Sequence, residues 1–122
     1  MKAHFILFVS DQQKSTEFYT SVLSMEPTLN VPGMTEFALG DDSVLGLMPT
    51  AGASRLLGLE FGDSHHPSGE VYLVVESAAD YHARALSLGA RELSPVEERD
   101  WGHTAAYSMD RDGHILAFAQ IT

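Results

Sequence analysis

The stretch that decides the fold is HFILFVSDQQKSTEFYTSVL, residues 4–23. It opens with a short aromatic and β-branched run, His4–Val9, which is typical of a β-strand. The apolar side chains that follow recur at four-residue spacing, which predicts an amphipathic helix over residues 11–23. Ser10 is followed three residues later by Gln13, the form of a capping box, so we expect Ser10 to cap this helix.

Working outward, the same order of elements occurs twice. After the first helix, turn residues separate two further strands, Met34–Leu39 and Val44–Met48. In the second half the predicted elements are a strand at Glu70–Val75, a helix between Ser77 and Gly89, and strands at residues 91–93, 103–109 and 114–119. Each half is therefore predicted to be a β-α-β-β-β module.

This repeat defines the expected fold class and domain organisation. We expect one α+β domain, with a first module at residues 1–50, a linker at 51–69 and a second module at 70–122. One module cannot cover both faces of its sheet. We therefore expect two curled, mixed sheets that enclose a concave cavity, with the helices outside.

Composition excludes several classes of protein. The chain has 122 residues, no cysteine and a formal net charge of −10. The missing cysteines exclude disulfide scaffolds and thiol catalysis. The negative charge disfavours nucleic acids and anionic membranes as partners. The N-terminus turns polar after nine residues and offers no small-residue cleavage site, so we expect no signal peptide and a cytoplasmic location.

Strand alternation predicts which side chains face the concavity. On the first strand, Phe5, Leu7 and Val9 are expected beneath the helix. The expected inward, ligand-binding residues are His4, Phe8, Gly46, Met48, Glu70, Tyr72, Trp101, His103, Tyr107 and Ala117. They combine aromatic surface with a few polar groups, which is typical of a small-molecule site, although the aromatic residues would also serve simply to fill a core.

Two motifs resemble a known family. Asp11-x-x-x-Ser15-x-x-Phe18-Tyr19 follows the first strand, and Asp110-x-Asp-Gly-His114 lies in the ending SMDRDGHILAFAQ. With the doubled module, these motifs are similar to the vicinal oxygen chelate superfamily. That group includes glyoxalase I, extradiol dioxygenases, fosfomycin-resistance enzymes and bleomycin-resistance binding proteins. The fold serves enzymes and plain binders alike, so it does not decide the function.

The resemblance also implies four positions for a divalent metal ion. They correspond here to His4 and Glu70 on the first strands, and to Gly46 and Ala117 on the closing strands. The last two carry no donor atom, whereas such ions need imidazole or carboxylate ligands. We therefore expect no metal and no other cofactor, and we expect the double variant Gly46→Glu with Ala117→Glu to create metal binding.

Several other polar clusters have plainer interpretations. The adjacent pair His65-His66 lies in the expected linker and is interpreted as a solvated loop. Asp110–Gly113 lacks the later ligands of a calcium loop and is interpreted as a hairpin turn. The acidic stretch of Glu97, Glu98 and Asp100 around Arg99 is likewise interpreted as a solvated loop.

The leading functional hypothesis is a metal-free protein that binds or sequesters a flat small molecule, with a cationic one favoured by the acidic charge. The first alternative is a metal-dependent lyase or dioxygenase whose metal site is incomplete or shared between subunits. The second is a metal-free enzyme in which His4 and Glu70 act as an acid–base pair. A regulatory module without ligand is a further alternative. In each case we expect a homodimer, because members of the family often complete their cavities by pairing.

Overall fold

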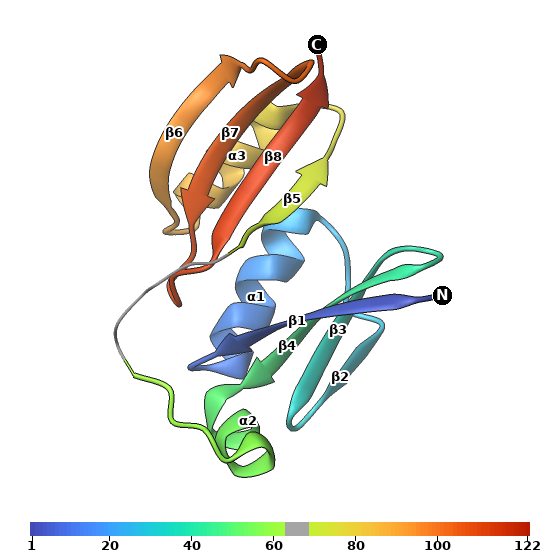
Figure 1. Cartoon of the computed structure of the whole chain (residues 1–122), viewed down its shortest axis with the longest axis vertical. Helices are drawn as coiled ribbons and strands as arrows, with labels where there is room; N and C mark the ends of the chain where they lie inside the picture. The colour runs from blue at the N-terminus through green and yellow to red at the C-terminus, as the bar shows by residue number, and fades with distance from the viewer. Residues whose placement is uncertain (63–68) are drawn as a thin grey trace. The chain divides into compact units, whose positions relative to one another are not determined.

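A computed structural model describes residues 1–62 and 69–122. It divides the chain into two compact units, residues 1–64 and 65–122. Each unit has the order β-α-β-β-β with a mixed four-stranded sheet, so the predicted α+β class and the doubled module are confirmed (Figure 1). The pair His65-His66 lies outside the described residues. That the two sheets enclose one cavity stays a prediction.

The first unit contains four strands and two helices. They are β1 (Ala3–Val9), α1 (Gln12–Leu23), β2 (Leu29–Val31), β3 (Met34–Gly40), β4 (Ser43–Pro49) and α2 (Thr50–Leu57). The strand order is β1-β4-β3-β2. β1 runs parallel to β4, and the other neighbouring pairs are antiparallel.

The core of this unit lies between α1 and the middle of the sheet. Leu45 and Leu47 of β4 are fully buried, as are Phe37 of β3 and Val22 of α1. The prediction that Phe5 packs beneath the helix is wrong, because its side chain is 63% exposed. β1 is the edge strand and α1 contacts mainly β3 and β4, so the beginning of β1 extends past the helix.

The cap of α1 differs by one residue from the prediction. Asp11, not Ser10, has the extended backbone of an N-cap, and its carboxylate accepts a hydrogen bond from the Lys14 amide at 3.0 Å. An aspartate also complements the positive end of the helix dipole, which a serine does not. Glutamine at the next position, Gln12, therefore lies inside the helix.

A short helix, α2, occupies the beginning of the segment expected to be a linker. It follows β4 directly and ends at Gly58, which has a φ of 70°. The sequence did not predict this helix because only Ala53 of it is buried, which leaves no apolar periodicity. Among the described residues, no helix is long and apolar enough to cross a membrane.

The second unit contains four strands and one helix. They are β5 (Val71–Val74), α3 (Ala78–Ser87), β6 (Arg91–Glu98), β7 (His103–Met109) and β8 (Ile115–Ile121), with the strand order β5-β8-β7-β6. The expected ends of α3 are confirmed: Ser77 caps it through the Asp80 amide, and Gly89 follows with a φ of 102°. The expected hairpin turn is also present, with Asp110 Oδ1 accepting hydrogen bonds from the Asp112 and His114 amides.

Strand β6 is longer than predicted. The expectation of a solvated loop is wrong for Glu97 and Glu98, which are paired with β7. The strand includes Pro95, although proline cannot donate to a ladder. It is tolerated here because β6 is an edge strand whose register shifts twice, between Glu92 and Ser94 and between Ser94 and Glu97.

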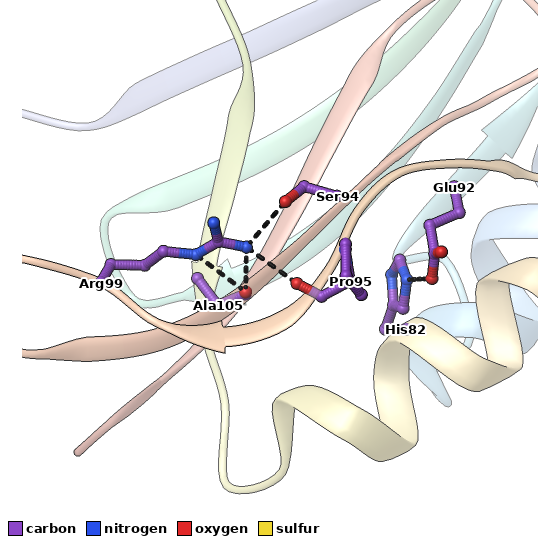
Figure 2. A network of polar contacts seen from close by, with 6 residues as sticks. All are labelled: His82, Glu92, Ser94, Pro95, Arg99 and Ala105. Atoms are coloured by element: carbon purple, nitrogen blue, oxygen red, sulfur yellow. Dashed lines mark hydrogen bonds and ion pairs between the residues drawn. The ribbon is translucent and has the colours of Figure 1, made fainter.

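Arg99 bridges this irregular pairing (Figure 2). Its guanidinium donates hydrogen bonds to the carbonyls of Pro95 and Ala105, each at 2.8 Å from Nη2, and to Ser94 Oγ at 3.0 Å. The arginine side chain thus links β6 to β7 where the bulged ladder cannot do so by itself.

Candidate functional site: two open sheet faces

The face of the second sheet opposite α3 carries most of the predicted aromatic residues. The register aligns Tyr72 of β5 with Ala117 of β8, and Ala117 with Tyr107 of β7. Leu116 and Phe118 alternate with Ala117, and Phe118 contacts Tyr81 of α3 at 5.4 Å between ring centroids. Residues that alternate in this way point to opposite sides, so Tyr72, Ala117 and Tyr107 lie on the open face.

A chain of hydrogen bonds joins three of these side chains. The indole Nε1 of Trp101 donates to the Tyr72 hydroxyl at 2.9 Å. The same hydroxyl lies 2.7 Å from His103 Nδ1, and the Tyr72 and His103 rings are stacked with centroids 5.8 Å apart. Trp101 is 56% exposed although its indole nitrogen is held. We call these three residues the aromatic triad.

Small side chains make room for the aromatic triad. Ala105, Ala117 and Ala119 of β7 and β8 are fully buried. Tyr72 is on β5 and His103 on β7, so the Tyr72 side chain must cross β8 to reach the imidazole. Alanine on β8 permits this path. Ala117 is fully buried at this place, and its predicted ligand-facing role stays a prediction.

Tyr107 lies beside the aromatic triad in a charged environment. The Arg99 guanidinium lies 5.3 Å from the centroid of its ring. Burial raises the pKa of the Tyr107 phenol above 10.0, and the charges of Glu70 and Tyr72 raise this pKa further, while Arg99 opposes them. The phenol therefore stays protonated at neutral pH and can donate or accept a hydrogen bond.

The open face of the first sheet carries a pair of polar side chains. His4 Nδ1 lies 3.5 Å from Glu36 Oε2. Gly46 is the direct partner of both Ile6 and Glu36 in the ladder. A Cβ atom at Gly46 would approach Ile6 Cγ1 to 3.1 Å and Met34 Sδ to 3.4 Å, so a side chain here requires these two neighbours to shift slightly.

Glu36 is the site residue that sequence reasoning missed. It alternates with Thr35 and Phe37, which are both fully buried on the helix side, so its own place on the open face was available from the strand pattern. We predicted Glu70 as the acidic partner of His4. Glu70 belongs to the other unit, so this pairing stays a prediction.

Phe8 and Met48 lie at the end of the same face. They are direct partners in the ladder. The Phe8 ring makes an edge-to-face contact with Phe61, with centroids 5.1 Å apart. Phe61 follows α2, so the segment after the closing strand turns back over this end of the sheet, which the sequence analysis did not foresee.

The residues at the positions that the resemblance assigns to a metal do not fit one. Gly46 has no side chain and Ala117 is a fully buried methyl group. The first unit brings together only His4 and Glu36 as donors on its open face. Within the described parts of either unit, no three His, Cys, Asp or Glu side chains gather closely enough to hold a metal ion.

A polar cluster around a second histidine, His82, lies on the opposite, helix-covered side of the second sheet (Figure 2). His82 of α3 is buried, and its Nε2 lies 2.9 Å from Glu92 Oε2. Ser108 is the direct partner of Glu92 in the ladder, and it is fully buried. His82 is buried beneath α3, whereas the Glu92 side chain is 46% exposed. The contact between them joins the helix to the sheet.

A comparison with protein-family models identifies the family of this chain. Residues 3–118 match the family model described as the Glyoxalase/Bleomycin resistance protein/Dioxygenase superfamily. No curated protein matches the chain significantly.

Solved structures share the fold at low sequence identity. A glyoxalase-related enzyme from Fulvimarina pelagi is 21% identical with a TM-score of 0.86, covering 98% of this chain and 87% of the other. A glyoxalase/bleomycin resistance protein/dioxygenase family enzyme from Burkholderia phytofirmans PsJN is 15% identical with a TM-score of 0.83, covering 98% and 97%. Because the family model spans nearly the whole sequence, the chain belongs to the glyoxalase/bleomycin resistance protein/dioxygenase superfamily.

Proposed function

We propose that this protein binds a flat small molecule without the help of a metal ion, on the open face of its second sheet. The observation that carries this proposal is the aromatic triad. Trp101 leaves more than half of its surface exposed while a hydrogen bond to Tyr72 fixes its indole ring. A large, rigid aromatic surface of this kind binds a planar ligand at low entropic cost.

The charges of the protein narrow the class of ligand that would bind. The net charge of −10 raises the local concentration of cations around the protein. At the face itself, however, Arg99 already lies over the Tyr107 ring. Stacking with a ligand therefore falls to Trp101, and the polar groups nearest to it are those of Tyr72 and His103.

The test is a screen of planar fragments read out by Trp101. Trp101 is the only tryptophan in the sequence, so its fluorescence and its indole ¹H–¹⁵N signal report this face alone. We expect flat, aromatic fragments at millimolar concentration to change both signals in the wild-type protein and to leave the remaining amide signals of the Trp101→Leu variant unchanged. If no fragment in a library of planar compounds perturbs Trp101, the proposal is wrong.

Elemental analysis of the gently purified, tag-free protein is the complementary measurement. Metal far below one equivalent, and no thermal stabilisation by Ni, Zn, Mn or Fe(II) salts, would support the proposal. Micromolar binding at millimolar metal would add about 4 kcal/mol to the stability, which a thermal shift detects readily. Stoichiometric metal would instead favour a metal-dependent lyase or dioxygenase.

A metal-free enzyme is the second candidate. The pairing of His4 with Glu36 favours it, because a carboxylate beside an imidazole is a common acid–base arrangement. Such an enzyme would lose turnover in both His4→Gln and Glu36→Gln while planar fragments still bound at Trp101. Deuterium exchange into an acidic C–H group of a candidate compound would identify such a substrate. A plain binder would catalyse no exchange.

A further inference from the structure

The open face of the second sheet contains a histidine whose protonation pattern follows from its neighbours. Trp101 Nε1–H can only donate, so the Tyr72 oxygen is the acceptor in their contact. The Tyr72 hydroxyl retains one proton of its own. Among the described residues, the only acceptor that it reaches is His103 Nδ1, at 2.7 Å.

This order of donors determines the tautomer of a neutral imidazole. If Tyr72 donates to Nδ1, this nitrogen carries no proton, and the ring proton must be on Nε2. The opposite tautomer would make Nδ1 a donor. The Tyr72 oxygen would then accept two hydrogen bonds, and its own proton would have no partner in the described part of the chain. The chain from Trp101 through Tyr72 to His103 is complete only in the first arrangement.

Nε2 of His103 is left as a free donor. The imidazole is half-buried, and its Nε2 has no hydrogen-bond partner among the described residues. An imidazole N–H beside an exposed indole can donate a hydrogen bond to an acceptor oxygen on a planar molecule. A carboxylate is disfavoured, because Glu70 acts on the same face and the whole chain is strongly acidic.

We infer that the Trp101–Tyr72–His103 chain holds His103 as an Nε2–H donor that recognises a carbonyl-type oxygen on a planar ligand stacked against Trp101. This inference rests on the proposed function, whose ligand class it narrows. His103 is the recognising residue. Tyr72 and Trp101 are positioning residues that act through it.

The first experiment needs no ligand. Long-range ¹H–¹⁵N correlation spectra of histidine rings distinguish the two tautomers, and His103→Gln assigns the signal. We expect the Nε2–H form in the wild type and a mixture of tautomers in Tyr72→Phe, which keeps the ring but removes the donor. Tyr81→Phe, on α3 at the other side of the sheet, is the matched control and should leave the spectrum of His103 unchanged. An Nδ1–H form in the wild type would overturn the inference.

The second experiment compares two planar probes of similar size. Coumarin carries a carbonyl oxygen, whereas naphthalene has no acceptor. Titrations followed by the Trp101 indole signal should give about tenfold tighter binding for coumarin, as expected for one neutral hydrogen bond. This preference should vanish in His103→Leu, which has no side-chain donor, and Tyr72→Phe should reduce it.

The outcomes separate the two proposals. Equal binding of coumarin and naphthalene, with the Nε2–H form present, would overturn the recognition of an acceptor oxygen but leave the binding function standing. A fragment screen without any effect on Trp101 would overturn the binding function, whatever the tautomer of His103.

Discussion

Asp11 and Gln12 are adjacent at the beginning of α1, and each stabilises a different feature of the first unit through its polar side chain. Asp11 caps the helix. Gln12 reaches across to the β2–β3 turn, where Nε2 donates to the Val31 carbonyl at 2.8 Å and Oε1 accepts from the Gly33 amide at 2.9 Å. Gly33 has a φ of 97°, so the turn needs both a glycine and an external partner.

The Asp11 cap gives a prediction at this scale. Asp11→Ala should lower the free energy of unfolding by about 1 kcal/mol, because the Lys14 amide loses its partner. Asp11→Asn keeps a capping oxygen and should cost much less. Chemical denaturation of both variants measures the difference, and equal losses would contradict the role of the side chain as a cap.

Tyr107 gives a second prediction. Its pKa is raised above 10.0 by burial first and by Glu70 second. Because the folded-state pKa exceeds the unfolded one, the protonated phenol contributes stability below about pH 10 that is lost as the pH rises through the folded-state pKa. The difference in tyrosinate absorbance between wild type and Tyr107→Phe reports this titration.

Changes of charge should move this titration in opposite directions. Glu70→Gln removes a negative charge and should lower the pKa of Tyr107. Arg99→Gln removes the opposing positive charge and should raise it. A Tyr107 pKa that is unaffected by either change would show that the two charges do not act on the phenol.

At the scale of elements, β6 is the strand that depends on a side chain from outside itself. Its pairing with β7 is interrupted twice, and Arg99 compensates by binding carbonyl oxygens of both the Pro95 and Ala105 residues. The fork of the guanidinium is needed, because the single ammonium of lysine cannot reproduce several directed donors.

Arg99→Lys should therefore destabilise the protein by about 1–3 kcal/mol, the range expected for hydrogen bonds that involve a charged group. Arg91→Lys, at the other end of β6, is the matched control. In the described part of the chain, the polar contact of the Arg91 side chain is a 3.6 Å contact with Met109 Sδ. Thermal unfolding compares the two variants. Equal stability would show that Arg99 is not needed for the β6–β7 pairing.

The register of β4 makes a further prediction at this scale. Gly46 lies beside Glu36 and on the same face as His4, so Gly46→His should complete a set of three donors. Gly46→Ala has the same contact with Ile6 Cγ1 but adds no ligand. We expect Ni(II) or Zn(II) to raise the melting temperature of the histidine variant only. The absence of any metal effect would contradict the register assigned to this face.

The burial of Ala117 argues against the double variant, Gly46→Glu with Ala117→Glu, that the sequence suggested for creating a metal site. Ala117→Glu would place an unpaired carboxylate at a fully buried position, which costs several kcal/mol. The single change at Gly46 avoids that cost.

For the whole molecule, the two modules leave large apolar side chains uncovered. Phe5, Leu56, Val74 and Ile121 are each more than half exposed. Such surface favours association of subunits. We expect a homodimer, and sedimentation at tens of micromolar protein measures it. A clean 13.3 kDa monomer would contradict this prediction.

The sequence by itself determined the doubled βαβββ order, the positions of most strands, the second helix with its Ser77 cap, and the family. These features depend on local periodicity, on turn residues and on short motifs, which are all readable along the chain. Where the prediction failed, at the Asp11 cap, the helix α2 and the length of β6, local signals were weak or contradictory. Pro95 is the clearest example.

Only the tertiary structure decided which polar groups meet. The partner of His4 is Glu36, 32 positions away, and Trp101 reaches Tyr72 across 29 positions. The burial of Ala117 was equally hidden, since an alanine looks the same in sequence whether it is buried or exposed. Such contacts depend on register and on the reach of side chains over neighbouring strands, and neither leaves a periodic signal in the sequence.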